Sequence, residues 1–92
     1  MKTIGNIHGE LFVQVGDPVF WYEDNQSTRL GGVDMVPVSE ITQRATRREG
    51  VVERITPEHK WGGPYVLITA EDGEGWDTCP ELFDSIFVKE VQ

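Results

Sequence analysis

The sequence has one cysteine, two histidines and half as many basic as acidic side chains, and each shortage excludes a class of protein. One cysteine cannot form an internal disulfide, so we expect the 92 residues to be held together by their core alone. His8 and His59 lie far apart and show no HxH, HxxxH or CxxC spacing, which disfavours zinc binding and Cys/His catalysis. Gly-rich phosphate-binding motifs and GxSxG are missing too. The sequence therefore predicts no enzyme, no cofactor and no metal.

Long hydrophobic runs are also missing, including from the first residues, MKTIGNIHGELFV. A secretory signal needs an apolar segment with a small-residue cleavage site, and a membrane-spanning helix needs a longer apolar segment still. We therefore expect neither of these segments, and we expect the reducing cytoplasm as the location.

Positive charge is scarce, with 8 basic against 16 acidic side chains and a net charge of −8. Such a charge opposes direct binding of the whole molecule to nucleic acid or to an anionic membrane. The acids are concentrated in the last third, which contains seven acidic residues and one basic residue, Lys89. The acidic residues are Glu71, Asp72, Glu74, Asp77, Glu81, Asp84 and Glu90. This distribution favours a basic partner.

Ten glycines and five prolines divide the chain into short segments, a spacing typical of an all-β protein. Alternating or β-branched runs predict strands, while 33–38 is expected to be a short edge piece and 39–49 at most a helical turn. The expected strands are 10–15, 19–23, 50–56, 65–70, 76–79 and 85–91, with a tight hairpin at Asp72 and Gly73. We expect the centre of the core at Val52, Val66, Ile68, Ile86 and Val88.

The order of these elements resembles an SH3-like small β-barrel over residues 16–92. GDPVFWYE is similar to its opening strand, REGVVERI to its second strand, PYVLITAEDGEGWDTC to its hairpin, and PELFDSIFVKEV to its helical turn and closing strand. The resemblance implies a single domain, 1–92, with 1–15 as an N-terminal strand extension and 16–92 as the SH3-like core. The predicted fold is a small antiparallel SH3-like barrel or a two-layer β-sandwich. No binding residues are carried over, because fold alone does not specify function.

Cys79 is a candidate nucleophile only if its thiolate is stabilised. Asp77 and Glu81 stand two residues away on either side and disfavour that form, and Pro80 follows directly. We therefore predict that Cys79 is a small structural residue and is dispensable for activity.

Aromatic residues beside turns and acids form the candidate binding surface. An alternating strand at 19–22 turns either Val19 and Trp21 or Phe20 and Tyr22 away from the core, unless both faces are covered. Trp and Tyr dominate protein interfaces, and acids can steer a basic partner toward them. The predicted partner-binding residues are Trp21, Tyr22, Glu23, Asp24, Trp61, Glu74 and Trp76. If these aromatics belong to the core, the acidic segment from Glu81 to Glu90 is the alternative surface.

Three functions fit these features. The first is a non-enzymatic acidic interaction module that binds a protein. The second is an acidic inhibitor, of the kind phages use against bacterial defence, that occupies the nucleic-acid groove of a DNA- or RNA-handling protein. The third is a nucleic-acid-binding barrel that uses the segment from Arg44 to Arg54, which also contains Arg47 and Arg48. The net charge weighs against the third function, and these arginines are expected to pair with the chain's own acids.

Overall fold

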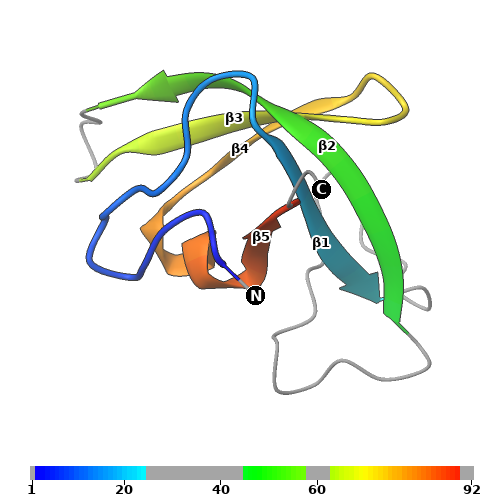
Figure 1. Cartoon of the computed structure of the whole chain (residues 1–92), viewed down its shortest axis with the longest axis horizontal. Helices are drawn as coiled ribbons and strands as arrows, with labels where there is room; N and C mark the ends of the chain where they lie inside the picture. Colours follow the sequence, from blue (N-terminus) through cyan, green and yellow to red (C-terminus); the bar gives the residue numbers. More distant parts are fainter. Residues whose placement is uncertain (1, 25–44, 58–62, 90–92) are drawn as a thin grey trace.

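The computed structural model describes residues 2–24, 45–57 and 63–89, and these residues form an all-β fold (Figure 1). Five antiparallel strands make one sheet in the order β4-β3-β2-β1-β5, and one short 3-10 helix, η2, precedes β5. The elements are β1 (Pro18–Asp24), β2 (Ala45–Thr56), β3 (Tyr65–Ala70), β4 (Gly75–Thr78), η2 (Pro80–Ser85) and β5 (Ile86–Val88). The predicted all-β class with one short helical turn is confirmed for these residues, and their strands form one sheet instead of the two of a sandwich.

Strand β2 is the longest element and joins the two halves of the sheet. Its first half pairs with β1, from Ala45 to Val51, and its second half pairs with β3, from Gly50 to Thr56. The register shifts between Val52 and Arg54, so a bulge falls where the long strand curves (Figure 1).

Gly50 lies where the two halves of the sheet meet. A Cβ atom there would lie 2.6 Å from the carbonyl oxygen of Thr69 and 3.1 Å from the ring of Trp21. Only glycine therefore allows β2, β3 and the indole of β1 to approach this closely.

The core lies on the inner face of the curled sheet, where period-2 alternation brings the β-branched residues together. Ile4 and Val13 from the N-terminal segment and Phe83 from η2 complete it. The core residues are Ile4, Val13, Val19, Trp21, Val52, Val66, Ile68, Ala70, Phe83 and Ile86. The expected centre is confirmed at Val52, Val66, Ile68 and Ile86, which are fully buried, while Val88 is half-buried and packs against the cluster.

The outer edge of β5 is covered by the start of the chain. The amide of Val88 donates to the carbonyl of Lys2, and the amide of Ile4 donates to the carbonyl of Ile86. Thr3 forms an isolated bridge with Phe87 between these two bonds. This pairing removes an open edge that could otherwise bind a further strand.

The expected strand at 10–15 is wrong. The side-chain Oδ1 of Asn6 accepts hydrogen bonds from the amides of His8 and Glu10, which turns the chain back on itself. Leu11 then makes one isolated bridge with Gly5, the amide of Phe12 donates to the carbonyl of Ile4, and residues 12–15 belong to no strand. Alternation of apolar residues was not sufficient to predict a strand here, because the turn at Asn6 directs the segment away from a strand with which it could pair.

The helical turn expected within 39–49 is wrong for the part that the structure describes. Residues 45–49 belong to β2, where Arg47 pairs with Tyr22 and Arg48 with Trp21. Pairing with the apolar β1 thus overrides the weak helical preference of these side chains. The predictions for 33–38 and for 39–44 lie outside the described residues.

The last two elements differ from prediction only in their bounds. The helical turn extends from Pro80 to Ser85, with Phe83 buried. Of the expected strand at 85–91, Ser85 belongs to η2, β5 contains Ile86–Val88, and 90 and 91 lie outside the described residues. The predicted hairpin at Asp72 and Gly73 is confirmed, with Gly73 at φ 90° and its amide bonded to the carbonyl of Ala70.

Candidate functional site

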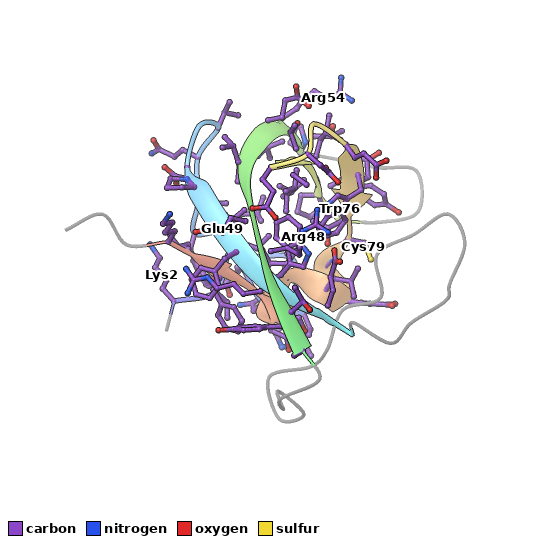
Figure 2. The ribbon with its side chains drawn as sticks, turned by 90° about the vertical axis from the view of Figure 1, so that its right-hand side faces the viewer. Lys2, Arg48, Glu49, Arg54, Trp76 and Cys79 are labelled. Atoms are coloured by element: carbon purple, nitrogen blue, oxygen red, sulfur yellow. The ribbon has the colours of Figure 1, made fainter. Side chains whose placement is uncertain are left out.

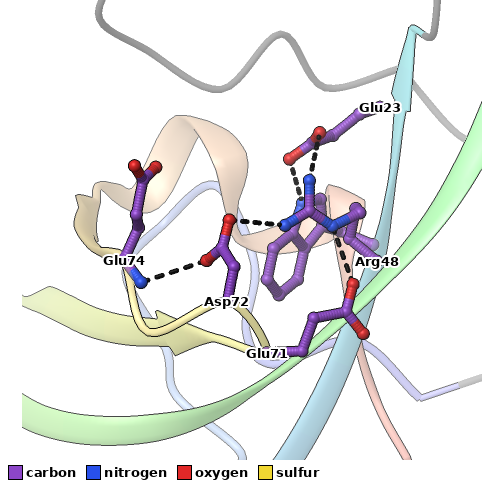
Figure 3. Close-up of polar contacts among 6 residues, drawn as sticks. Glu23, Arg48, Glu71, Asp72 and Glu74 are labelled. Atoms are coloured by element: carbon purple, nitrogen blue, oxygen red, sulfur yellow. Dashed lines mark hydrogen bonds and ion pairs between the residues drawn. The ribbon is translucent and has the colours of Figure 1, made fainter.

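The most concentrated polar group in the described structure surrounds Arg48 (Figure 3). Its Nε donates to Glu71 Oε1 at 2.8 Å, its Nη1 to Glu23 Oε2 at 3.3 Å, and its Nη2 to Asp72 Oδ2 at 3.1 Å. A single guanidinium thus holds three carboxylates from two distant parts of the chain. We call Glu23, Arg48, Glu71, Asp72 and Glu74 the acidic end.

The sheet positions this guanidinium. Because Arg48 pairs with Trp21 across β1 and β2, both side chains point to the inner face, and Glu23 lies on the same face two residues further along β1. The turn between β3 and β4 brings Glu71 and Asp72 in from the other half of the sheet. Glu23 is fixed a second time, because its Oε1 accepts a 3.0 Å hydrogen bond from Trp21 Nε1.

Glu74 completes the acidic end without a side-chain contact to Arg48. Its amide donates to Asp72 Oδ1 at 3.0 Å, and its own carboxylate is exposed. The acidic end therefore combines four carboxylates with one guanidinium, a formal charge of −3.

The electrostatics follow from these bonds. The pKa of Arg48 is raised, first by its hydrogen bond to Glu71 and then by the charges of Glu23 and Asp72, against the opposing effect of burial. The pKa of Asp72 is lowered, first by the amide of Glu74 and then by Arg48. Both groups are therefore charged at neutral pH.

A cavity of about 160 Å³ opens between the acidic end and two indole rings. Its lining residues are Trp21, Glu23, Arg48, Ala70, Asp72, Glu74 and Trp76. The two indoles meet edge to face, with centroids 5.3 Å apart and planes at 73°. The Nε1 atom of Trp76 is buried and has no hydrogen-bond acceptor among the described residues. An unpaired buried donor is unusual and calls for an explanation.

The structure brings four of the predicted binding residues to this one cavity: Trp21, Glu23, Glu74 and Trp76. Trp21 is 0% exposed and part of the core, so the Val19 and Trp21 face of β1 turns inward, which the sequence left open. Trp76 is half-buried, as its place beside a turn suggests. Trp76 is therefore the one described tryptophan that a partner can reach.

Of the other predicted residues, Tyr22 does not line this cavity. Tyr22 lies on the outer face of β1, where its ring packs edge to face with Phe20 and Phe87. Asp24 ends β1 opposite Ala45. Trp61 lies outside the described residues. The outer face of β1 is also largely covered, because Phe20 is only 6% exposed.

Arg48, Glu71 and Asp72 were absent from the predicted site. Arg48 and Glu71 are 23 positions apart, and the sequence does not reveal that their strands meet. The expectation that these arginines pair with the chain's own acids was the available signal, and it is confirmed for Arg48 and for Arg47, whose Nη2 lies 3.5 Å from Glu49 Oε1.

The basic segment is divided between different surfaces. Arg47 lies on the outer face, with its guanidinium 4.0 Å above the ring centre of Phe20, whereas Arg48 lies on the inner face. Arg54 is exposed, and Figure 2 shows it well apart from Arg48. Arg44 lies outside the described residues. The described arginines thus form no common basic face.

Cys79 lies at the start of η2, where its carbonyl accepts the amide of Leu82. It is half-buried and lines a second cavity, of about 410 Å³, together with exposed His8 and half-buried Tyr65. The sequence did not predict that His8 and Cys79 would share a cavity. The dispensability of Cys79 stays a prediction.

No three His, Cys, Asp or Glu side chains among the described residues are arranged to hold a metal ion. None of the helical segments in 2–24, 45–57 and 63–89 has the length and apolar character needed to cross a bilayer.

Comparison with known proteins supplies no relative: no family model matches the chain, and neither a curated protein nor a solved structure matches it.

Proposed function

We propose that this protein is a non-enzymatic acidic module that binds a basic protein partner through the acidic end. The observation that carries the proposal is the arrangement around Arg48, where one guanidinium holds three carboxylates beside the reachable indole of Trp76. Carboxylates that are fixed in position next to an aromatic side chain are typical of surfaces that first attract a basic partner by charge and then bind it through the aromatic ring.

The charge of the acidic end supports this proposal. Arg48 neutralises one carboxylate out of four, and Glu74 makes no side-chain hydrogen bond with the described residues. Asp77, exposed on the neighbouring β4, adds a further negative charge on the opposite face of that strand from Trp76. The field of these groups attracts basic proteins and accelerates their association at low salt.

We also propose that the fold is SH3-like. Support comes from the antiparallel pairing of β5 with β1, from the meander of β2, β3 and β4, and from the 3-10 helix between β4 and β5. This proposal concerns the fold only and assigns no ligand.

The acidic inhibitor remains the second candidate. The exposed carboxylates of Glu71, Asp72, Glu74 and Asp77 follow one another along the β3–β4 turn and β4, and this succession of negative charges suits a groove that normally holds nucleic acid. If the partner handles nucleic acid, the two proposals merge, because the acidic end would compete with the phosphates.

Paired variants test the proposal. The first replaces Glu71 and Glu74 with glutamine, and the second replaces Glu10 and Glu81, two exposed glutamates outside the acidic end, in the same way. Both change the net charge equally. Affinity capture from the native host with each variant and with the wild type should recover one protein that the first variant loses and the second retains.

The partner's own activity then separates the two candidates. Purified partner should bind the wild type, and added duplex DNA or RNA should displace it only if the partner is a nucleic-acid-handling protein. A partner that both variants lose equally, or that only the second variant loses, contradicts the proposal and points to the surface that contains Glu81.

A further inference from the structure

The sheet ends in β4 on one side and in β5 on the other, and these two edges differ. The outer edge of β5 pairs with the start of the chain, through the bonds of Lys2 and Ile4. The outer edge of β4 has no such partner among residues 2–24, 45–57 and 63–89. An uncovered edge is a place where a further strand can add to a sheet.

The hydrogen bonds of the β3–β4 hairpin show which main-chain groups of β4 face outward. The amide of Ala70 donates to the carbonyl of Glu74, so these two residues form a hydrogen-bonded pair. Bonded and non-bonded pairs alternate along an antiparallel ladder, so Trp76, two residues further on, also bonds to β3. The residues on either side of it, Gly75 and Asp77, therefore point their amides and carbonyls away from β3.

These outward groups are accessible. Gly75 and Asp77 are both exposed, and neither forms a main-chain hydrogen bond on the outer side with the residues that the structure describes. Gly75 has no side chain to obstruct an approaching strand, and the described atoms nearest to a Cβ there all belong to β3. The two residues are two positions apart, which is the spacing at which an antiparallel strand forms its paired bonds.

We propose that an extended basic segment of the protein partner adds to the outer edge of β4 as an antiparallel strand. The inference rests on the function proposed above and names the way in which the partner binds beside the acidic end. Two residues of the segment, two positions apart, exchange main-chain hydrogen bonds with Gly75 and Asp77. A lysine or arginine opposite Asp77 lies on the same face and pairs with its carboxylate.

Charge selects a basic segment over a second copy of this chain. The edge carries exposed Asp77 and begins directly after exposed Glu74. Two copies paired through β4 would bring these acids together, and each copy has a net charge of −8. Opposite charges on neighbouring strands stabilise the pairing, whereas like charges destabilise it. The segment that fits alternates basic with β-branched residues, and the latter extend the inner face beside Trp76.

The test uses the full ¹⁵N-labelled chain and one basic probe, acetyl-Lys-Val-Lys-Val-Lys-Val-Lys-amide. Two matched probes carry either glutamate in place of every lysine, or a methyl group on every lysine main-chain nitrogen, which keeps the charge and removes the donors. We expect the basic probe to shift the amide resonances of Gly75 and Asp77 saturably, more than those of Trp76 and Thr78, and to slow their hydrogen exchange. Neither matched probe should do so.

Variants at one position separate the main-chain bond from the charge. Asp77→Asn keeps the amide and should weaken binding of the basic probe about threefold, whereas Glu10→Gln, an equal loss of charge at an exposed glutamate elsewhere, should leave it unchanged. Asp77→Pro also removes the outward amide and should abolish saturable binding. Proline is tolerated on an edge strand where its nitrogen faces away from the ladder. If this variant does not fold, the methylated probe tests the same bonds from the other strand.

Each other outcome overturns the inference. Without a saturable shift by the basic probe, Asp77 only prevents other strands from pairing here. Equal binding of the methylated probe would exclude strand addition, and equal binding of the glutamate probe would exclude selection by charge. Slow exchange of the Gly75 and Asp77 amides in the free protein would show that the chain itself covers the edge, or a second copy if the protection increases with protein concentration.

Affinity capture separates this inference from the proposed function. If folded Asp77→Pro retains the partner that the variant lacking Glu71 and Glu74 loses, only strand addition is wrong. If the variant lacking Glu71 and Glu74 retains the partner, the proposed function itself fails.

Discussion

Arg48 and Glu71 are joined by a 2.8 Å hydrogen bond from Nε to Oε1, which ties the middle strand of the sheet to the β3–β4 turn. The side chain of Arg48 is 26% exposed and that of Glu71 is 53% exposed, so the guanidinium is partly shielded while solvent still screens the contact. The bond is therefore a structural element as well as part of the candidate site.

Replacing Arg48 with alanine should lower the free energy of unfolding by about 1 to 2 kcal/mol at low salt, because three carboxylates lose their common counter-charge. Arg48→Lys should recover only part of this loss, since an ammonium cannot reproduce the fork of donors. Urea unfolding measures both changes. The control is Arg54→Ala, an exposed arginine on the same strand, which should change stability by less than about 0.5 kcal/mol. Equal effects at both positions would show that the three bonds of Arg48 do not stabilise the fold.

Acid should weaken the fold in a defined pH range. The pKa of Asp72 is lowered, first by the amide of Glu74, and the pKa of Glu49 is lowered, first by Lys89, whose Nζ lies 2.8 Å from Glu49 Oε1. A lowered folded-state pKa stabilises the fold above the unfolded-state value and loses this contribution as pH falls through the folded-state value. Stability should therefore fall below about pH 4.

The matching measurement is the urea midpoint between pH 5 and pH 3. Asp72→Asn and Glu49→Gln should each flatten its pH dependence, because neither new side chain titrates. Asp72 is exposed and the side chain of Glu49 is 39% exposed, so added salt should flatten it as well. An unchanged dependence in both variants would mean that other carboxylates control the response to acid.

Truncation of Ile68 tests the core. Ile68 is fully buried at the centre of β3, so Ile68→Ala should cost about 2 to 4 kcal/mol in unfolding free energy. Val51, which is 44% exposed on the adjacent strand, is the control and should lose far less on replacement by alanine. A loss below about 0.5 kcal/mol at Ile68 would refute the placement of β3.

Two glycines of the sheet should respond differently to the same change. At Gly50 a methyl group meets the carbonyl of Thr69 at 2.6 Å, so Gly50→Ala should destabilise the protein by about 1 to 3 kcal/mol. At Gly75 the nearest atom, Leu67 Cδ1, is 3.6 Å away, so Gly75→Ala should be tolerated. Thermal unfolding compares the two. Similar melting temperatures would show that β2 and β3 do not approach each other as closely as described.

The sequence predicted strands that are defined by local preference better than it predicted segments whose structure depends on what they pair with. The run YVLITA and the turn after it are defined by local preference, and both were placed correctly. Residues 45–49 were not, because their strand depends on pairing with β1, and the segment at 10–15 was not, because Asn6 redirects it.

The residues of the candidate site also fall into two groups, those that the sequence predicted and those that depend on tertiary structure. Glu23, Glu74 and Trp76 could be named from composition and proximity to turns, and they do share a cavity. The burial of Trp21 depends on its close approach to Gly50 of β2, and the contacts of Arg48 depend on which strands are adjacent. Both are consequences of tertiary structure that residue pattern alone does not contain.

The most direct test of the acidic end is the affinity of the purified partner for the two double variants, measured by titration at low and at physiological salt. We expect the loss of Glu71 and Glu74 to weaken binding at least about tenfold and to reduce its salt dependence, because these charges steer and hold the partner. The loss of Glu10 and Glu81 should leave the affinity within about twofold of the wild type. Equal affinities of the two variants, with both proteins folded, would contradict the assignment of the acidic end as the binding surface.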